Sequence, residues 1–257
     1  MATIKETLSS DTLFHFTSKH EYLISILQSD FAPRYCLENL TMLGFTQNDK
    51  IQMEVAVPMV CFCDIPLSKI KFHLNCYGGY GIGMTKAWGI KNGISPVLYA
   101  NPKSETVMVI KEILKIARLK VNQINDVIIN LGNSITHLTK FVKPYKGNFV
   151  HRGKTHRNRR YYDEREWRYV PIKASIAFLN KNEFLDTDTR ARADWVLNDN
   201  CKLKFSPNDI EYIIVKNKSE VLQMIKDIMA IKYKYTDDEK MLLASKIISK
   251  DKIIKDF

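Results

Sequence analysis

Two glutamates in the second half of the chain have the residue type and spacing that chemistry most often uses. Glu164 and Glu166 are separated by one residue in YYDEREWRYV (161–170), whose alternation is typical of a β-strand. On a strand both carboxylates would point to one face, about 6.5–7 Å apart along the backbone. Neighbouring carboxylates raise each other's pKa unless cations intervene, and Arg168 would share their face. The pair therefore indicates either an acid–base site or a solvated strand with ion pairs.

A histidine near the start of the chain is the second candidate. His15 lies between Phe14 and Phe16 in LFHFT, so on a strand it would face away from both. It is either a partly buried, hydrogen-bonded structural residue or a group that binds a ligand.

The third candidate is the segment YGGYGIGM (77–84), which holds four of the ten glycines together with Tyr77 and Tyr80. We expect a loop here, because glycine lets the backbone approach a ligand closely. The segment matches neither the phosphate-loop pattern nor the dinucleotide-binding glycine pattern.

A basic segment precedes the glutamates. HRGKTHRNRR (151–160) has no carboxylate and no aliphatic side chain, so we expect a surface loop. Together with Tyr161 and Tyr162, its cations suit phosphates and unstacked bases. The whole chain has 39 Lys and Arg against 28 Asp and Glu, a net charge of +11, which indicates either a polyanion partner or a lysine-rich surface. The candidate nucleic-acid-binding residues are Arg152, Lys154, Arg157, Arg159 and Arg160.

Cysteine usage and hydropathy exclude several classes. Five cysteines are too few and odd in number for a disulfide framework. The nearest approach to a zinc set is Cys61, Cys63, His73 and Cys76, but an apolar strand is a poor place for tetrahedral ligands, so we expect no metal. No apolar run approaches the roughly 20 residues of a membrane span, and the first 20 residues lack an apolar signal core. We therefore expect a cytoplasmic protein that does not contact the membrane.

The elements that must position these residues indicate one α+β domain over 1–257. Short strands outnumber strand–helix–strand alternations. Helical periodicity predicts a helical insertion at about 103–142 and C-terminal helices at about 219–257. Capping-box spacing predicts helix starts after Ser18 and after Thr236. The strand candidates are 13–17, 55–62, 96–99, 161–170, 172–178, 201–205 and 210–215.

Four blocks of the chain, taken in order, resemble known families. LFHFTSKHEYLISIL, VPMVCFCDIPLS, YGGYGIGMTKAWG and YDEREWRYVP resemble the AbiGi family of abortive-infection (phage-defence) proteins over nearly all 257 residues. That family is commonly labelled an antitoxin. The shorter blocks around His15 and Glu166 also resemble the ADP-ribosyltransferase fold, in the branch that modifies nucleic acids and includes the DarT-like toxins and the RNA 2′-phosphotransferases.

The transferase resemblance implies a split β-sheet core with NAD, the co-substrate, in a cleft between two sheets. His15 would hydrogen-bond the adenosine-side ribose, and the neighbouring backbone of Phe16 and Thr17 would hold the nicotinamide amide. Tyr77 or Tyr80 would stack on the nicotinamide ring.

The same resemblance implies the catalytic roles. Glu166 would accept a hydrogen bond from the ribose 2′-hydroxyl and stabilise the oxocarbenium-like transition state. Glu164 would orient the acceptor or act as its base, and Arg34 would neutralise the pyrophosphate. We expect Glu166→Gln to abolish transfer and to leave the melting temperature nearly unchanged. Two features depart from the pattern: no Ser-Thr-Ser block is present, and the insertion at 103–142 is unusual and would serve as a partner platform.

Three hypotheses of function follow. The first is an NAD-dependent ADP-ribosyltransferase, a phage-defence toxin or effector that modifies RNA or DNA and has a cognate antitoxin. The second is a non-catalytic antitoxin or regulator that binds nucleic acid or its toxin. The third is a nuclease that uses the glutamate pair and the histidine. The sequence favours the enzyme, because His15, the tyrosine–glycine segment and Glu166 occur together.

Overall fold

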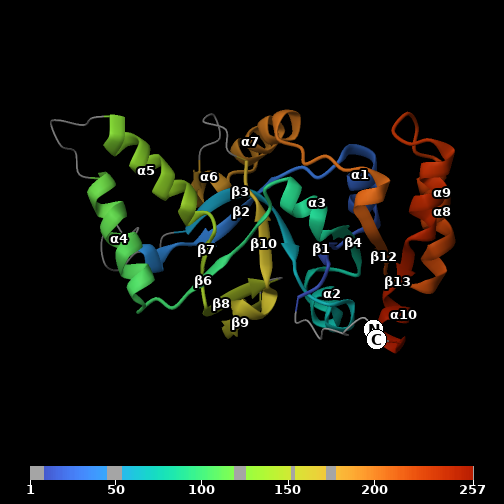
Figure 1. The fold of residues 1–257 in the computed structure, drawn as a ribbon, viewed down its shortest axis with the longest axis horizontal. Helices are drawn as coiled ribbons and strands as arrows, with labels where there is room; N and C mark the ends of the chain where they lie inside the picture. Colours follow the sequence, from blue (N-terminus) through green and yellow to red (C-terminus); the bar gives the residue numbers. More distant parts are fainter. Residues whose placement is uncertain (1–8, 45–53, 119–125, 152–153, 172–177, 257) are drawn as a thin grey trace, which may run out of the picture. The chain divides into compact units, whose positions relative to one another are not determined.

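The structure is a computed structural model that describes residues 9–44, 54–118, 126–151, 154–171 and 178–256 (Figure 1). It contains helices and a mixed sheet of antiparallel and parallel strand pairs, and this confirms the predicted α+β class. The chain divides into two compact units. Unit 1 consists of Met1–Pro33, Val60–Ser95 and Asn198–Phe257, and unit 2 consists of Arg34–Met59 and Pro96–Leu197.

A sheet organises unit 1. Its strand order is β13 (Ile247–Ser249), β12 (Ile210–Val215), β4 (Tyr80–Thr85), β1 (Thr12–Thr17) and the last residues of β3 (Glu54–Cys63). β12 and β13 are parallel, and the other neighbours are antiparallel. β1 pairs with β4 along its whole length, from Thr12↔Thr85 to Thr17↔Tyr80. The loop conformation predicted for 77–84 is therefore wrong for most of the segment, because Tyr80–Met84 belong to an inner strand, whereas a ligand-binding role of Tyr77 or Tyr80 stays a prediction.

The glycines of β4 make room for side chains of the neighbouring strands. A Cβ atom on Gly83 would lie 2.8 Å from Cγ2 of Thr12 and 2.9 Å from Cε1 of Phe14. A Cβ atom on Gly81 would lie 3.0 Å from Cδ1 of Phe16. The close approach that glycine permits is thus used for packing between strands, which a glycine-rich sequence does not distinguish from a loop.

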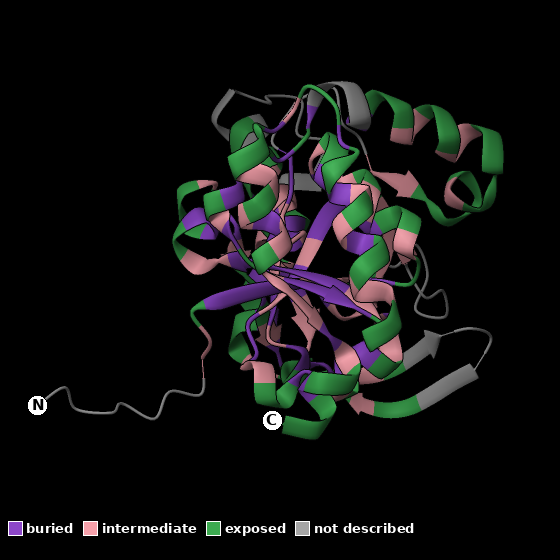
Figure 2. Ribbon diagram, turned by 90° about the vertical axis from the view of Figure 1, so that its right-hand side faces the viewer, coloured by how far each residue is buried: buried purple, intermediate pink, exposed green. Residues whose placement is uncertain are grey.

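Helices cover this sheet. In Figure 2 the strands are mostly coloured as buried, whereas the helices carry exposed outer faces. Thr236 caps its helix, because its hydroxyl accepts a hydrogen bond from the Glu239 amide as predicted. The predicted cap at Ser18 is wrong, since the helix begins one residue later and Lys19 takes the cap position without a side-chain bond. The helices are α1 (His20–Ser29), α2 (Lys71–Tyr77), α3 (Lys86–Lys91), α8 (Val221–Met229), α9 (Asp237–Ser245) and α10 (Lys250–Asp256).

In unit 2, β2 (Arg34–Asn39) pairs antiparallel with the first part of β3, from Arg34↔Met59 to Asn39↔Glu54. β11 (Leu179–Asn180) pairs with β3 at Ala56. The strand expected at 172–178 lies outside the described residues except for its last position. The strand expected at 201–205, in unit 1, is reduced to a single bridge between Leu203 and Phe31.

Two helices follow one another in the predicted insertion. α4 (Glu105–Arg118) and α5 (Asp126–Thr139) lie side by side (Figure 1) and bury Val107, Ile110 and Ile135, which confirms that the insertion is helical. α6 (Lys181–Leu185) and α7 (Thr187–Asn200) come later in the chain. Within the described part of the chain, no helix is long and apolar enough to cross a membrane.

The basic segment is a β-hairpin and not a loop. β8 (Lys146–His151) pairs antiparallel with β9 (Lys154–Arg160), with a register shift between Gly147 and Phe149. Backbone pairing forms the hairpin although the segment lacks the aliphatic residues that suggest a strand. The remaining strands of this region are β6 (Leu98–Ala100) and β7 (Val142–Pro144), which are parallel, together with β5 (Ser95–Pro96) and β10 (Glu166–Tyr169).

Candidate functional site

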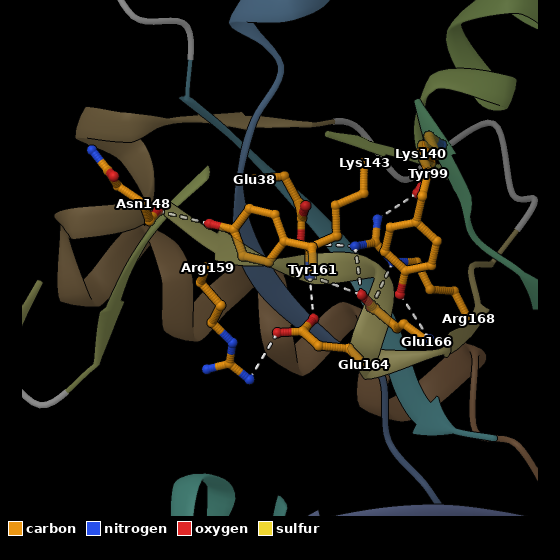
Figure 3. A network of polar contacts seen from close by, with 10 residues as sticks. All are labelled: Glu38, Tyr99, Lys140, Lys143, Asn148, Arg159, Tyr161, Glu164, Glu166 and Arg168. Atoms are coloured by element: carbon orange, nitrogen blue, oxygen red, sulfur yellow. Dashed lines mark hydrogen bonds and ion pairs between the residues drawn. The ribbon is translucent and has the colours of Figure 1, made fainter. Parts of the chain in front are cut away.

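Glu164 and Glu166 meet at a turn. The segment predicted as a continuous strand begins with a 3₁₀ helix, η3 (Tyr161–Glu164), and β10 starts only at Glu166. Arg165 between them has φ 42° and ψ 49°, the left-handed conformation that ends the 3₁₀ helix. The strand prediction is therefore wrong over 161–165 and confirmed over Glu166–Tyr169. The predicted proximity of the two carboxylates is nevertheless observed, because Lys143 Nζ lies 2.9 Å from Oε2 of each (Figure 3).

Arg168 holds Glu166 from the other side. Its Nε donates to Oε1 of Glu166 at 2.7 Å and its Nη2 to Oε2 at 3.1 Å. The same guanidinium donates to Glu38 Oε1 at 3.0 Å and to the Lys140 carbonyl oxygen at 2.7 Å. All four residues of this arrangement come from unit 2, and Figure 3 shows them converging.

Arg159 completes the cluster, with Nη2 3.1 Å from Oε1 of Glu164. Three carboxylates thus face three cations. Glu164 is 4% exposed, Glu166 6% and Arg168 1%, so the charges are almost removed from water. Buried ions persist only when they are paired and hydrogen-bonded. We call these residues the charge network: Glu38, Lys143, Arg159, Glu164, Glu166 and Arg168.

The network keeps Glu166 and Lys143 charged. Burial would raise the pKa of Glu166, but Arg168 and Lys143 outweigh burial and hold that pKa below the ordinary 4.5. Burial would lower the pKa of Lys143, but Glu166, Glu38 and Glu164 together raise it well above 10.5. The carboxylate is therefore ionised and the amine protonated at neutral pH.

Two tyrosines brace the network. The hydroxyl of Tyr99 accepts a hydrogen bond from the Glu166 amide at 2.8 Å, and burial with the charge of Glu166 raises the pKa of Tyr99. Tyr161 is buried, its hydroxyl donates to the Asn148 carbonyl at 2.7 Å, and its ring lies 4.8 Å from Lys143 Nζ. The sequence prediction placed Tyr161 against nucleic acid, which its burial contradicts.

Lys143, Glu38 and Tyr99 were missed by sequence reasoning. Lys143 stands in FVKPY and Glu38 in a strand, with no spacing that links either to the glutamates. The one local signal was a lysine among apolar and aromatic neighbours.

His15 is a partly buried residue of unit 1. Its Nδ1 lies 2.8 Å from the carbonyl oxygen of Cys61, and its ring packs edge-on against Phe31 at 5.3 Å and beside Phe62 at 5.8 Å. Burial lowers the pKa of His15, and the bond to Cys61 offsets this only in part. This geometry corresponds to the structural alternative for His15.

The other residues proposed to bind NAD are divided between the units. Tyr80 lies opposite Thr17 across the β1–β4 pair, and burial with a hydrogen bond to Glu220 raises the pKa of Tyr80 to about 12. Phe16 lies on the same strand as Thr17, and Tyr77 ends α2. Arg34 is an exposed residue at the start of β2 in unit 2. That His15 and Glu166 line one crevice stays a prediction.

The predicted basic residues differ in what they face. Arg157 and Arg160 are exposed, whereas Arg159 turns inward to Glu164. Arg152 and the side chain of Lys154 lie outside the described residues. The five cysteines form no disulfide bond with one another. Over the residues that the structure describes, no group of three or more His, Cys, Asp or Glu side chains could hold a metal ion.

Comparisons with known proteins identify the family. A family model described as "Putative abortive phage resistance protein AbiGi, antitoxin" matches residues 29–216. The abortive phage resistance protein AbiGi of Lactococcus lactis subsp. cremoris is 30% identical, over 88% of this chain and 99% of the relative. The chain belongs to the AbiGi family. No solved structure matches it. The AbiGi match contains every residue of the charge network.

Proposed function

We propose that this AbiGi protein is the antitoxin of an abortive phage-resistance system, a non-catalytic protein that restrains a toxin partner by binding it. The family to which the chain belongs is described as an antitoxin, and the lactococcal relative is named for phage resistance. This corresponds to the second hypothesis from the sequence and not to the preferred one.

The observation that carries the proposal is the engagement of both candidate catalytic carboxylates. Each oxygen of Glu166 accepts from Arg168, and one also accepts from Lys143. Glu164 has one oxygen at Lys143 and the other at Arg159. A catalytic carboxylate has to reach its substrate, whereas these carboxylates are buried among cations of their own unit. Such a network suits a rigid scaffold for binding.

Gene deletion tests the proposal. In a host that carries the whole resistance locus, removing this gene should arrest growth even when no phage is present. A copy of the gene on a plasmid should restore growth. Arg34→Ala and Tyr80→Phe alter exposed or partly exposed residues with proposed NAD roles, so both variants should restore growth fully. Normal growth of the deletion strain, with loss of phage resistance alone, would make the chain an effector and contradict the proposal.

An NAD-dependent ADP-ribosyltransferase is the second candidate. Supporting it are the two carboxylates that converge on Lys143 and the adjoining strands that carry His15 and Tyr80. This function requires a split-sheet cleft that holds NAD. It also requires that the Glu166 side chain break its hydrogen bonds to Arg168 in order to reach the substrate. Incubating the folded protein with labelled NAD and RNA, DNA or cell lysate tests it. Transfer that Tyr80→Phe and Arg34→Ala weaken would support the transferase, and no transfer to any acceptor would exclude it.

A further inference from the structure

Two exposed tyrosines lie together at the base of the β8–β9 hairpin. Tyr145 is 38% exposed and Tyr162 48%, and their ring centroids are 5.8 Å apart. The Tyr162 amide donates to the Tyr145 carbonyl at 3.4 Å, which ties η3 to the residue before β8. Neither ring fills the core, so the two tyrosines in contact present exposed aromatic faces on the protein surface.

The tyrosines rest on a rigid support. The ring of Tyr99 packs edge-on against Tyr162 at 5.5 Å, and its hydroxyl holds the Glu166 amide. Glu164, the last residue of η3, is fixed by Lys143. The charge network therefore positions the short helix that presents Tyr162. A preorganised surface loses less conformational entropy when it binds.

The hairpin that follows Tyr145 carries exposed cations. Lys146 and Arg160 are opposite each other in the β8–β9 register, and both are exposed. Arg160 donates from Nε to Asp163 at 2.7 Å and also hydrogen-bonds the Tyr145 side chain, so it lies beside the rings. Arg157 is exposed farther along β9. We call this set the tyrosine–cation surface: Tyr145, Lys146, Arg157, Arg160 and Tyr162.

We propose that the tyrosine–cation surface binds single-stranded nucleic acid. Unstacked bases can lie on the Tyr145 and Tyr162 rings, and the cations can take the phosphates on either side. A duplex keeps its bases stacked and would use the cations alone. An acidic protein would also bind the cations, but it has no unstacked bases to place on the two tyrosine rings. The net charge of +11 attracts a polyanion over a longer range. This inference goes beyond the proposed antitoxin role and does not depend on it.

Fluorescence anisotropy with the full chain tests the inference. The probes are labelled 20-nucleotide single strands of RNA and DNA, together with a duplex of the same length. Single strands should bind at least ten-fold more tightly than the duplex. Tyr145→Ala with Tyr162→Ala should weaken single-strand binding about ten-fold or more, because each base stacked on an aromatic ring contributes strongly. Tyr162→Phe keeps the ring and should bind like the wild type.

Tyr22→Ala is the matched control. Tyr22 is 49% exposed on α1, with Lys19 Nζ 5.5 Å from its ring centroid, so it offers a similar tyrosine beside a cation elsewhere on the chain. It should leave affinity unchanged. Arg157→Ala should reduce the slope of log affinity against log salt by about 0.7, one phosphate contact on a single strand.

Three results would overturn the inference. One is equal affinity for duplex and single strands with no effect of the tyrosine changes. Another is the absence of binding to any probe by a folded sample at low salt. The third is a combination of two results: poly-glutamate at equal charge concentration displaces the oligonucleotide, and the tyrosine variants bind the oligonucleotide as the wild type does. That combination would assign the surface to an acidic protein instead.

Discussion

Arg168 binds Glu166 through two hydrogen bonds, from Nε to Oε1 at 2.7 Å and from Nη2 to Oε2 at 3.1 Å. Both side chains are almost completely buried. Bidentate pairs of this kind are among the strongest charge-assisted contacts in proteins. A carboxylate held in this way contributes to the positioning of η3 and β10, and the catalytic role of Glu166 stays a prediction.

Replacing Glu166 by Gln should lower the free energy of unfolding by about 3 kcal/mol, because it leaves the buried Arg168 and Lys143 cations without their shared counter-charge. This is the opposite of the silent effect that the sequence interpretation expects. Urea denaturation at pH 7 measures the change. Glu112→Gln, at an exposed position of α4 in the same unit, should change stability by less than about 0.5 kcal/mol. Equal stabilities of the two variants would show that Glu166 is not held by its cations.

The network should also make stability depend on pH in acid. The folded pKa of Glu166 lies below its ordinary value of 4.5, so its contribution is complete above about pH 4.5 and is lost as the pH falls through the folded value. The folded pKa of Lys143 lies well above 10.5, so its contribution is lost only at higher pH. Unfolding free energy measured from pH 7 to pH 3 should therefore fall below pH 4.5, and it should fall less steeply in Glu166→Gln. Parallel curves for the two proteins would contradict this.

The sequence predicted those elements whose apolar residues recur with a clear local periodicity. The strand around His15, the apolar strand β3 and helices α4, α5 and α9 are found close to their expected positions. It failed where long-range packing decides. Gly81 and Gly83 suggested a loop, because the local sequence does not show what packs over them. Those side chains belong to β1, another part of the chain. Glu38 reaches Arg168 across 130 positions of the chain, and no spacing rule connects residues so far apart.

The packing role of Gly83 can be tested by adding one methyl group. Gly83→Ala should lower the free energy of unfolding by about 1–3 kcal/mol, because the new Cβ would meet Thr12 and the buried ring of Phe14 within 3 Å. Thermal and urea denaturation measure the loss. Gly93→Asn is the control, since nothing lies within 4 Å of its Cβ and Asn tolerates the φ of +69° found there. A Gly83→Ala protein as stable as the wild type would contradict this packing role. It would then favour the alternative that the glycine makes room for a ligand.

His15 gives a second pH test, at milder acidity. Its folded pKa is lowered from 6.5 chiefly by burial, so the unfolded chain takes up the proton at a higher pH than the folded one. The stability due to neutral His15 is therefore complete above about pH 6.5 and falls as the pH drops below that value. Unfolding free energy should therefore decrease between pH 7.5 and pH 5.5, across the ordinary pKa of histidine. His15→Gln keeps a donor for the Cys61 carbonyl but cannot titrate, so the decrease should be smaller in this variant than in the wild type. Because the other five histidines are present in both proteins, an identical decrease in the variant would show that the imidazole of His15 does not titrate differently in the folded and unfolded states.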